Sequence, residues 1–249
     1  LEEIFQSPEM TTQNYLVEFG FSPKIIDRFF KPFFAGIFLE PNLSTSSRMF
    51  EFVYKMFGEG YACIPQLGIG EISQQLKNKL QHTEFIFNCA VEKVTNEHIL
   101  LRSGEKKMHQ GVIIASNASA LLDGLKDQEI DWKGCLCVYF EVDKTNIPNK
   151  TIALLAELDK CTNNFYAYPD AQTGKKILSA TTLQQNDQSE EELIEKMRAE
   201  VIQYAGASQV NYIHHYKILH ALPDIQDLRL TAEPTESQIR ENIFLAGDY

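Results

Sequence analysis

The sequence lacks a surplus of positive charge, and this absence excludes one large class of partners. Its 23 lysine and arginine residues are outnumbered by 34 aspartate and glutamate residues, which gives a formal net charge of −11. Binding to nucleic acid needs a concentrated basic surface that neutralises phosphates. No basic stretch with interleaved aromatic residues occurs in the chain. We therefore expect no nucleic-acid partner.

Long apolar runs are missing as well. No run approaches the about 20 residues that a membrane-spanning helix requires, and no signal peptide is recognisable. Cysteine is scarce, and the five residues fit no recurring spacing: Cys63, Cys89, Cys135, Cys137 and Cys161. We expect them to be buried or half-buried free thiols, with Cys135 and Cys137 on one face of a strand. Free thiols favour a reducing, cytoplasmic environment.

A metal site is not expected either. Two thiols at Cys135 and Cys137 are too few for zinc, and no second Cys or His pair follows at ligand spacing. His214 and His215 would face opposite sides of a strand, so they cannot easily bind one ion.

The composition is that of a globular protein with one large or two modest domains. Of its 249 residues, 44% are hydrophobic, and 16 Phe and 10 Tyr exclude a disordered chain. The first residue is Leu1, and the chain stops at the end of an apparent buried strand at 243–249. We expect it to be a piece of a longer protein.

Residues 1–60 predict three helices. Ser7-Pro8 and Ser22-Pro23 have the form of an N-cap followed by a first-turn proline, and Ser44 can cap the third helix. The third helix carries an apolar stripe, which consists of Met49, Phe52, Val53, Met56 and Phe57. The aromatic stretch between the helices contains Phe29, Phe30, Phe33, Phe34 and Phe38. These five side chains belong either to a helix core or to the lining of an apolar substrate pocket.

From Tyr61 onward the pattern changes to one helix and short strands. Ile72, Leu76 and Leu80 are spaced by four along one helix face. Strands are predicted at 85–87, 90–94, 99–101 and 112–116. The last of these is a continuous apolar run, which is typical of a strand buried on both faces.

Residues 134–220 predict an antiparallel sheet of five strands, at 135–142, 151–158, 164–168, 176–182 and 210–219. One helix interrupts them. Ser189 and Glu192 form a capping box at its start, and Gly206 ends it. Leu193, Met197, Val201 and Tyr204 form its buried face.

Gly68-Ile69-Gly70 precedes a helix, but it is a weak phosphate-binding signal. A dinucleotide fingerprint needs a preceding strand and a third glycine, whereas Pro65 interrupts the strand here and Ser73 occupies the third position. The motif is better interpreted as a tight turn that begins a helix.

Several short elements together resemble the flavin-containing amine oxidases, protoporphyrinogen oxidases and phytoene desaturases. Pro65-x-x-Gly68-x-Gly70-x-Ile72-x-x-x-Leu76 resembles a turn and helix of that family. Val91-x-x-Val94, Ser103-Gly104 and Ile113-Ile114-Ala115 follow in the family's order. Ala221-Leu222-Pro223 and Phe244-Leu245-Ala246-Gly247-Asp248 resemble its late elements.

The resemblance implies FAD as the cofactor and assigns four residues to it. Val91 would pair its backbone with the adenine, unless it is only a core strand residue. Gly68 would keep the turn tight beside the flavin ring. Gly247 would let the backbone approach the ligand closely, because it has no Cβ. Asp248 would approach the ribityl and phosphate part, although it could equally be a helix N-cap.

Some family features are absent from the sequence. Ile69 replaces a family glycine, and the fingerprint that binds the pyrophosphate is missing. Family members often carry a lysine near the flavin, and Lys126 is the first lysine after the strand at 112–116, but it does not align. No catalytic residue is therefore assigned, and we expect this chain alone to be inactive and not to retain FAD.

The substrate would be a small apolar molecule or an amine, with the phenylalanine-rich stretch slightly favouring the apolar one. Tyr216, His220 and Leu222 are the candidate substrate-binding residues. Tyr212 is a further candidate, because its spacing predicts that it shares a strand face with Tyr216.

These observations predict an α+β fold of mixed helices and strands. Residues 1–60 form the helical part of a substrate domain, and 61–120 form a partial FAD/NAD(P)-binding-domain segment. Residues 121–240 form the antiparallel or mixed β-sheet of the substrate domain, and 241–249 begin the final FAD-domain strand. The predicted activity is that of an FAD-dependent oxidoreductase that oxidises a C–H bond by hydride transfer. The alternative is a non-catalytic binding or scaffolding protein with a degenerate flavin site.

Overall fold

The chain folds as two compact units, and the boundary between them falls inside one helix. A computed structural model describes residues 1–125, 131–157, 159–170, 173–183, 189–224, 228–231 and 233–247. The first unit comprises Leu1–Val53 and Ile130–Leu228. The second unit comprises Tyr54–Glu129 and Arg229–Tyr249. Mixed helices and sheets confirm the predicted α+β class.

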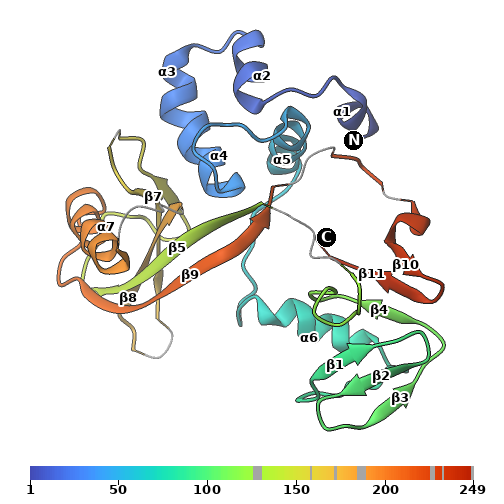
Figure 1. Ribbon diagram of the computed structural model, residues 1–249. Helices are drawn as coiled ribbons and strands as arrows, with labels where there is room; N and C mark the ends of the chain where they lie inside the picture. Colours follow the sequence, from blue (N-terminus) through green and yellow to red (C-terminus); the bar gives the residue numbers. More distant parts are fainter. Residues whose placement is uncertain are drawn as a thin grey trace. The chain divides into compact units, whose positions relative to one another are not determined.

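A five-stranded antiparallel sheet dominates the first unit (Figure 1), in the order β6-β7-β8-β5-β9. Its strands are β5 (Trp132–Val142), β6 (Ile152–Leu154), β7 (Thr162–Pro169), β8 (Lys176–Leu183) and β9 (Asn211–Pro223). The five predicted strands are therefore confirmed. Strand β6 is shorter than predicted, while β9 continues four residues further than the predicted end, to Pro223.

One face of this sheet is covered by helix α7 (Glu190–Tyr204), which lies against it in Figure 1. Alternate residues of β5 point to this face, and Val138, Phe140 and Val142 are fully buried there with Met197 and Val201 of α7. The predicted capping box is confirmed in part, because Ser189 Oγ accepts a hydrogen bond from the backbone N–H of Glu192 at 3.3 Å.

The other helices of the first unit build a separate core rich in phenylalanine. They are α1 (Glu2–Gln6), α2 (Thr12–Glu18), α3 (Pro23–Ile25), the π-helical turn η1 (Ile26–Phe30), α4 (Lys31–Phe38) and the start of α5 (Ser47–Glu59). All of them except α1 and α3 contribute buried residues to this core. Phe30, Phe34 and Phe38 are buried with Phe50, whereas Phe29 is 43% exposed. The core interpretation of the phenylalanine stretch therefore holds for three of its members.

The proline ring of Pro32 explains the π-helical turn η1. Pro32 follows it within a continuous helical stretch, and proline has neither a backbone N–H nor room for the carbonyl four residues earlier. Widening the preceding turn to π geometry relieves that clash. Pro32 therefore sits inside a helix that runs on to Phe38.

Two predicted helix starts are wrong. Ser7 ends α1 instead of starting a helix, and Thr11 caps α2 by accepting the backbone N–H of Asn14 at 3.2 Å. Ser44 does not cap α5, which begins at Ser47. The buried carboxylate of Glu40 accepts the backbone N–H groups of Asn42 and Thr45, and this holds the intervening residues as a loop.

The second unit contains two small sheets and one helix. The antiparallel sheet β1-β2-β3 consists of Val91–Val94, His98–Leu101 and Lys106–Met108. The sheet β10-β11-β4 consists of Gln238–Arg240, Ile243–Leu245 and Val112–Ile114, preceded by the short 3-10 helix η2 (Pro234–Ser237). Helix α6 spans Gly70–Lys79. The small core is formed by Val94, Ile114, Ala118, Leu122 and Ile243.

Three predictions for this unit are wrong. Residues 85–87 are not a strand, since no described strand pairs with them. The run at 112–116 is not buried on both faces: Ile114 is 3% exposed, whereas Ile113, whose side chain points to the opposite face, is 70% exposed. The apolar stripe of α6 is not buried either, and Ile72, Leu76 and Leu80 all stay about half exposed.

The unit boundaries also differ from the predicted segments. Residues 229–240 group with the second unit, because β10 pairs with β11 in an antiparallel manner. Residues 54–60 and 121–125 group with that unit as well. Among the described residues, no helix combines the length and apolarity needed to cross a bilayer.

The prediction of buried or half-buried free thiols is confirmed for four cysteines and wrong for Cys63. Cys63 is exposed, and the other four cysteines are partly buried. Burial raises the pKa of Cys161 to about 12, and the neighbouring carboxylate of Glu200 adds to this. Thiolates are the reactive form of cysteine, so Cys161 should stay unreactive at neutral pH.

We therefore expect iodoacetamide at pH 8 to modify Cys63 rapidly and Cys161 at least tenfold more slowly. Peptide mass spectrometry over a time course measures both rates in one sample. Equal rates for the two thiols would contradict the described burial of Cys161.

Candidate functional site

In the second unit, two neighbouring parallel strands end at the same edge. Strand β11 pairs with β4 in parallel register, with Ile243 opposite Val112 and Leu245 opposite Ile114. The backbone N–H of Ala246 donates to the carbonyl oxygen of Ile114 at 3.0 Å. The loops that leave both strands therefore start side by side. The carboxyl ends of parallel strands are the usual ligand-binding edge of such sheets.

Gly247 lies in the loop that follows β11 at this edge. Its φ is 136°, which side chains with a Cβ rarely adopt, so the residue type is explained by the backbone conformation. Gly68 has a φ of 95° in a turn closed by its own N–H and the carbonyl oxygen of Pro65 at 3.0 Å. The predicted tight turn at Gly68 is thus confirmed. Its position beside a flavin ring stays a prediction.

Val91 begins β1 at an irregular point of the sheet. It pairs with Leu101, and the register shifts between Val91 and Lys93. Its side chain is partly buried against the core of this unit. The structural interpretation of Val91 as a core strand residue is therefore sufficient, and its predicted adenine contact stays a prediction.

Two residues discussed from the sequence lie outside the described part of the chain. They are Asp248, the predicted ribityl and phosphate contact, and Lys126, the lysine that did not align. Within the described residues, no group of three or more His, Cys, Asp or Glu side chains could hold a metal ion.

In the first unit, the centre of the sheet face opposite α7 carries neutral polar and aromatic side chains. Its central members are Cys137, Tyr139, Tyr166, Tyr168, Ser179 and Tyr216, and we call this set the tyrosine face. Cys137 Sγ lies 3.2 Å from Ser179 Oγ. Tyr166 and Tyr168 stack with ring centroids 5.8 Å apart. Tyr139 and Tyr216 meet edge to face at 5.9 Å.

Two hydroxyl groups of this face, those of Tyr139 and Tyr168, stay protonated over a wide pH range. Burial raises the pKa of Tyr139, and a hydrogen bond with Cys137 raises it further. Burial raises the pKa of Tyr168 as well. The phenols therefore present neutral O–H groups, which can donate a hydrogen bond to a ligand or accept one.

Strand β9 places one candidate on the tyrosine face and removes another from it. Tyr216 pairs with Cys137, but a register shift between the pairs Tyr139–His214 and Phe140–Tyr212 turns Tyr212 to the opposite face. Tyr212 Oη lies 2.8 Å from His215 Nδ1 there. The prediction that Tyr212 and Tyr216 share a face is therefore wrong, because sequence spacing does not reveal a bulge.

The other two substrate-binding candidates lie near the far end of β9. Leu222 pairs with Lys133, and His220 stacks on Trp132 with ring centroids 5.2 Å apart. A second register shift, between Lys133 and Cys135, separates this end from Tyr216. The structure therefore does not gather Tyr216, His220 and Leu222 into one cluster.

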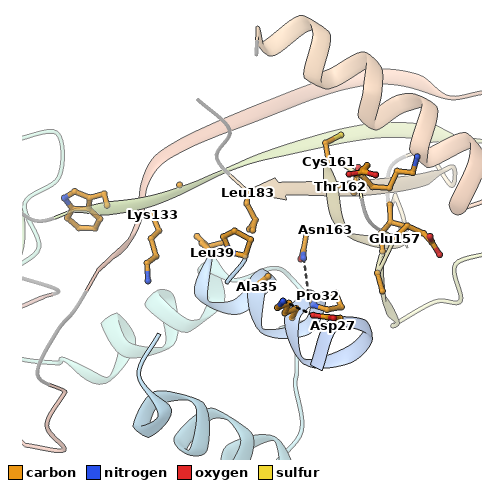
Figure 2. A pocket seen from close by; sticks show the side chains of 18 residues that line it. Asp27, Pro32, Ala35, Leu39, Lys133, Glu157, Cys161, Thr162, Asn163 and Leu183 are labelled. Atoms are coloured by element: carbon orange, nitrogen blue, oxygen red, sulfur yellow. Dashed lines mark hydrogen bonds and ion pairs between the residues drawn. The ribbon is translucent and has the colours of Figure 1, made fainter. Parts of the chain in front are cut away.

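Trp132 and Lys133 line a cleft of about 550 Å³ between α4 and the sheet. Figure 2 shows Asn163 pointing toward α4, where its Nδ2 donates to the carbonyl oxygen of Pro32 at 3.0 Å. Gly36 permits this approach, because a Cβ there would lie 2.6 Å from Asn163 Oδ1. Lys133 is held by Asp224 at 2.8 Å. None of the phenylalanines at 29–38 lines this cleft.

The family model of flavin-containing amine oxidoreductases matches residues 9–249, which is nearly the whole chain. The chain belongs to that family. No curated protein sequence matches it.

Solved structures support the fold. An oxidoreductase from Methanosarcina mazei is 14% identical with a TM-score of 0.74, and the match covers 99% of this chain and 65% of that one. A protein from Pyrococcus furiosus is 12% identical with a TM-score of 0.72, covering 99% and 64%. A putrescine oxidase mutant is 14% identical with a TM-score of 0.61, covering 84% and 53%. The chain thus spans just under two thirds of the first two proteins.

The tyrosine face was largely missed from the sequence. Tyr166 and Tyr168 lie two residues apart in a predicted strand, and Cys135, Cys137 and Tyr139 alternate in another. This alternation was a usable signal, because residues i and i+2 share a strand face. What the sequence did not provide was the register between strands, which brings Tyr139 opposite Ser179 and Ser179 opposite Tyr166.

Proposed function

We propose that the protein to which this chain belongs is an FAD-dependent oxidoreductase that oxidises a C–H bond of a small apolar or amine substrate. The family match over residues 9–249 carries the proposal. The first unit would hold the substrate, and the second would contribute to the cofactor site. We further propose a cytoplasmic location, in keeping with the free thiols.

The described residues of the second unit fit a flavin nucleotide. The paired ends of β4 and β11 offer a backbone edge, and Gly247 keeps side-chain atoms away from it. Gly68 and Val91 would complete this part of the site. The chemistry that a bound flavin supplies is the acceptance of a hydride from a substrate C–H bond.

The residues of the first unit would orient the substrate and exclude water from it. The tyrosine face offers aromatic surface and neutral O–H groups. None of these groups needs to move a proton for hydride transfer to occur, which is consistent with the absence of a conspicuous acid–base pair from the sequence.

A second candidate function is a non-catalytic binding or scaffolding protein. Ile69, in place of a family glycine, favours it, since the turn at Gly68 would then be built differently beside a flavin. Anaerobic mixing of the flavin-loaded whole protein with candidate substrates separates the two. An oxidoreductase bleaches the visible flavin absorbance with at least one substrate class, whereas a scaffold leaves it unchanged with all of them.

Gly247→Val should lower the affinity of the whole protein for FAD at least about fivefold. A β-branched residue cannot adopt a φ of 136° without strain, and such strain costs about 1–3 kcal/mol. Isothermal titration of the flavin-free protein with FAD measures the change.

Gly58→Ala is the matched control, because a Cβ at Gly58 meets no atom within 4 Å. It should bind FAD as the unmodified protein does. An unchanged affinity in Gly247→Val would remove Gly247 from the cofactor site.

A further inference from the structure

The centre of the tyrosine face is formed by two rows of side chains across the sheet. Paired residues of adjacent strands point to the same side, so the register defines each row. The rows are Tyr166–Ser179–Tyr139–His214 and Asn164–Thr181–Cys137–Tyr216. Neither row contains a carboxylate, a lysine or an arginine. The described residues at the centre of this face thus offer a ligand no carboxylate, ammonium or guanidinium group.

The nearest carboxylate in the strand register is already engaged. Glu141 pairs with Ile177, which pairs with Tyr168, so it belongs to the next row. Its Oε1 lies 2.7 Å from Lys175 Nζ. A buried ammonium group needs a carboxylate of its own, because leaving a charge unpaired away from water is costly. An ammonium group placed on the central rows would lack that partner.

We propose that the tyrosine face binds an uncharged aromatic or conjugated part of the substrate and discriminates against an ammonium group. This inference rests on the proposed function, because it takes the first unit as the substrate-binding part. It narrows the substrate from an apolar molecule or an amine to a neutral, flat molecule that carries hydrogen-bonding oxygen.

Two features of the face match that chemistry. The stacked pair Tyr166–Tyr168 and the edge-to-face pair Tyr139–Tyr216 present ring faces and edges on which a flat π system packs well. Ser179 and Thr181 both lie within 3.5 Å of Cys137 Sγ, so this thiol is held among neutral hydroxyl groups. Those hydroxyls can reorient to donate to a carbonyl or hydroxyl oxygen.

A charge-matched ligand series tests the proposal. The probes are 2-naphthalenemethanol, 2-naphthalenemethylamine and 2-naphthoate, which share one ring system and differ in charge at neutral pH. Equilibrium dialysis against the whole protein gives a Kd for each without requiring flavin. We expect the alcohol to bind at least tenfold more tightly than the amine or the carboxylate.

Variants of the face locate the binding. Tyr166→Ala removes one ring of the stacked pair and should weaken alcohol binding about tenfold. Ser179→Asp places a carboxylate in a central row and should reverse the preference toward the amine. Tyr139→Phe removes only a hydroxyl, so it tests the face even if Ser179→Asp fails to fold. Glu195→Gln on exposed α7 is the control and should change no Kd.

The proposal is overturned if the amine binds as tightly as the alcohol, if no probe binds, or if Tyr166→Ala and Tyr139→Phe both leave the alcohol Kd unchanged. These outcomes are independent of the cofactor. If the protein binds no FAD but prefers the alcohol, the proposed function is wrong and this inference stands. If the protein binds FAD but prefers the amine, this inference is wrong and the proposed function stands.

Discussion

Phe34→Ala should lower the free energy of unfolding of the first unit by about 4 kcal/mol, the usual cost of removing a buried phenylalanine ring. Phe34 is 0% exposed and is the centre of the helical core. Its ring contacts Phe38 at 5.4 Å and Phe50 at 4.7 Å between centroids. Truncation leaves a cavity that these neighbours cannot fill, because Phe38 is held on α4 and Phe50 on α5.

Urea denaturation followed by Trp132 fluorescence measures this effect. Trp132 is the only tryptophan of the chain and begins β5 in the same unit. Phe29→Ala is the matched control, since Phe29 precedes Phe34 by five residues in the same helical stretch and is 43% exposed. We expect the control to cost less than about 1.5 kcal/mol, and similar losses in both variants would contradict the described core.

The second large effect is expected at Glu200, a carboxylate of α7 that is only 8% exposed. It accepts the backbone N–H groups of Cys161 at 3.1 Å and Thr162 at 2.9 Å, at the start of β7. Glu200→Gln keeps the shape but removes the charge and offers one acceptor atom in place of two. We expect a loss of about 3 kcal/mol in the free energy of unfolding, because buried donors would be left unsatisfied.

The contribution of Glu200 should depend on pH in a defined direction. Burial opposes its ionisation, but the hydrogen bonds from Thr162 and Cys161 outweigh burial and hold its pKa below the usual 4.5. A carboxyl group with a lowered pKa stabilises the fold above its unfolded pKa and loses this effect as pH falls through its folded value.

The difference between the unmodified protein and Glu200→Gln should therefore be constant from pH 8 to about pH 5 and shrink at lower pH. Urea denaturation at several pH values measures it. Glu195→Gln, an exposed change on the same helix, should show no such dependence. A difference that grows on acidification would show that the Glu200 pKa is raised instead of lowered.

Local chemistry made much of the fold predictable from the sequence. The alternation in β5 and the capping box at Ser189 each encode their element in adjacent residues. Ser22-Pro23 likewise marks the start of α3. Ser7-Pro8 has the same form and fails, because Thr11 provides the cap that is used. A local pattern shows which residues could cap a helix, and the surrounding residues determine which of them does so.

The candidate site was predictable only in its separate pieces. Gly68 was predicted to keep a turn tight, and its positive φ agrees with that. Gly247 also has a positive φ, while its predicted close approach to a ligand stays a prediction. The tyrosine face depends on strand register, and the position of Tyr212 depends on a bulge. Both are set by pairing between residues distant in sequence, and spacing along one segment carries no information about them.

The measurement that tests the central claim most directly is the visible spectrum of the whole protein after incubation with FAD and gel filtration. The account predicts a yellow protein, with the absorbance of oxidised flavin in the protein fraction at close to one flavin per chain. A folded but colourless protein that leaves all FAD in the small-molecule fraction would contradict it.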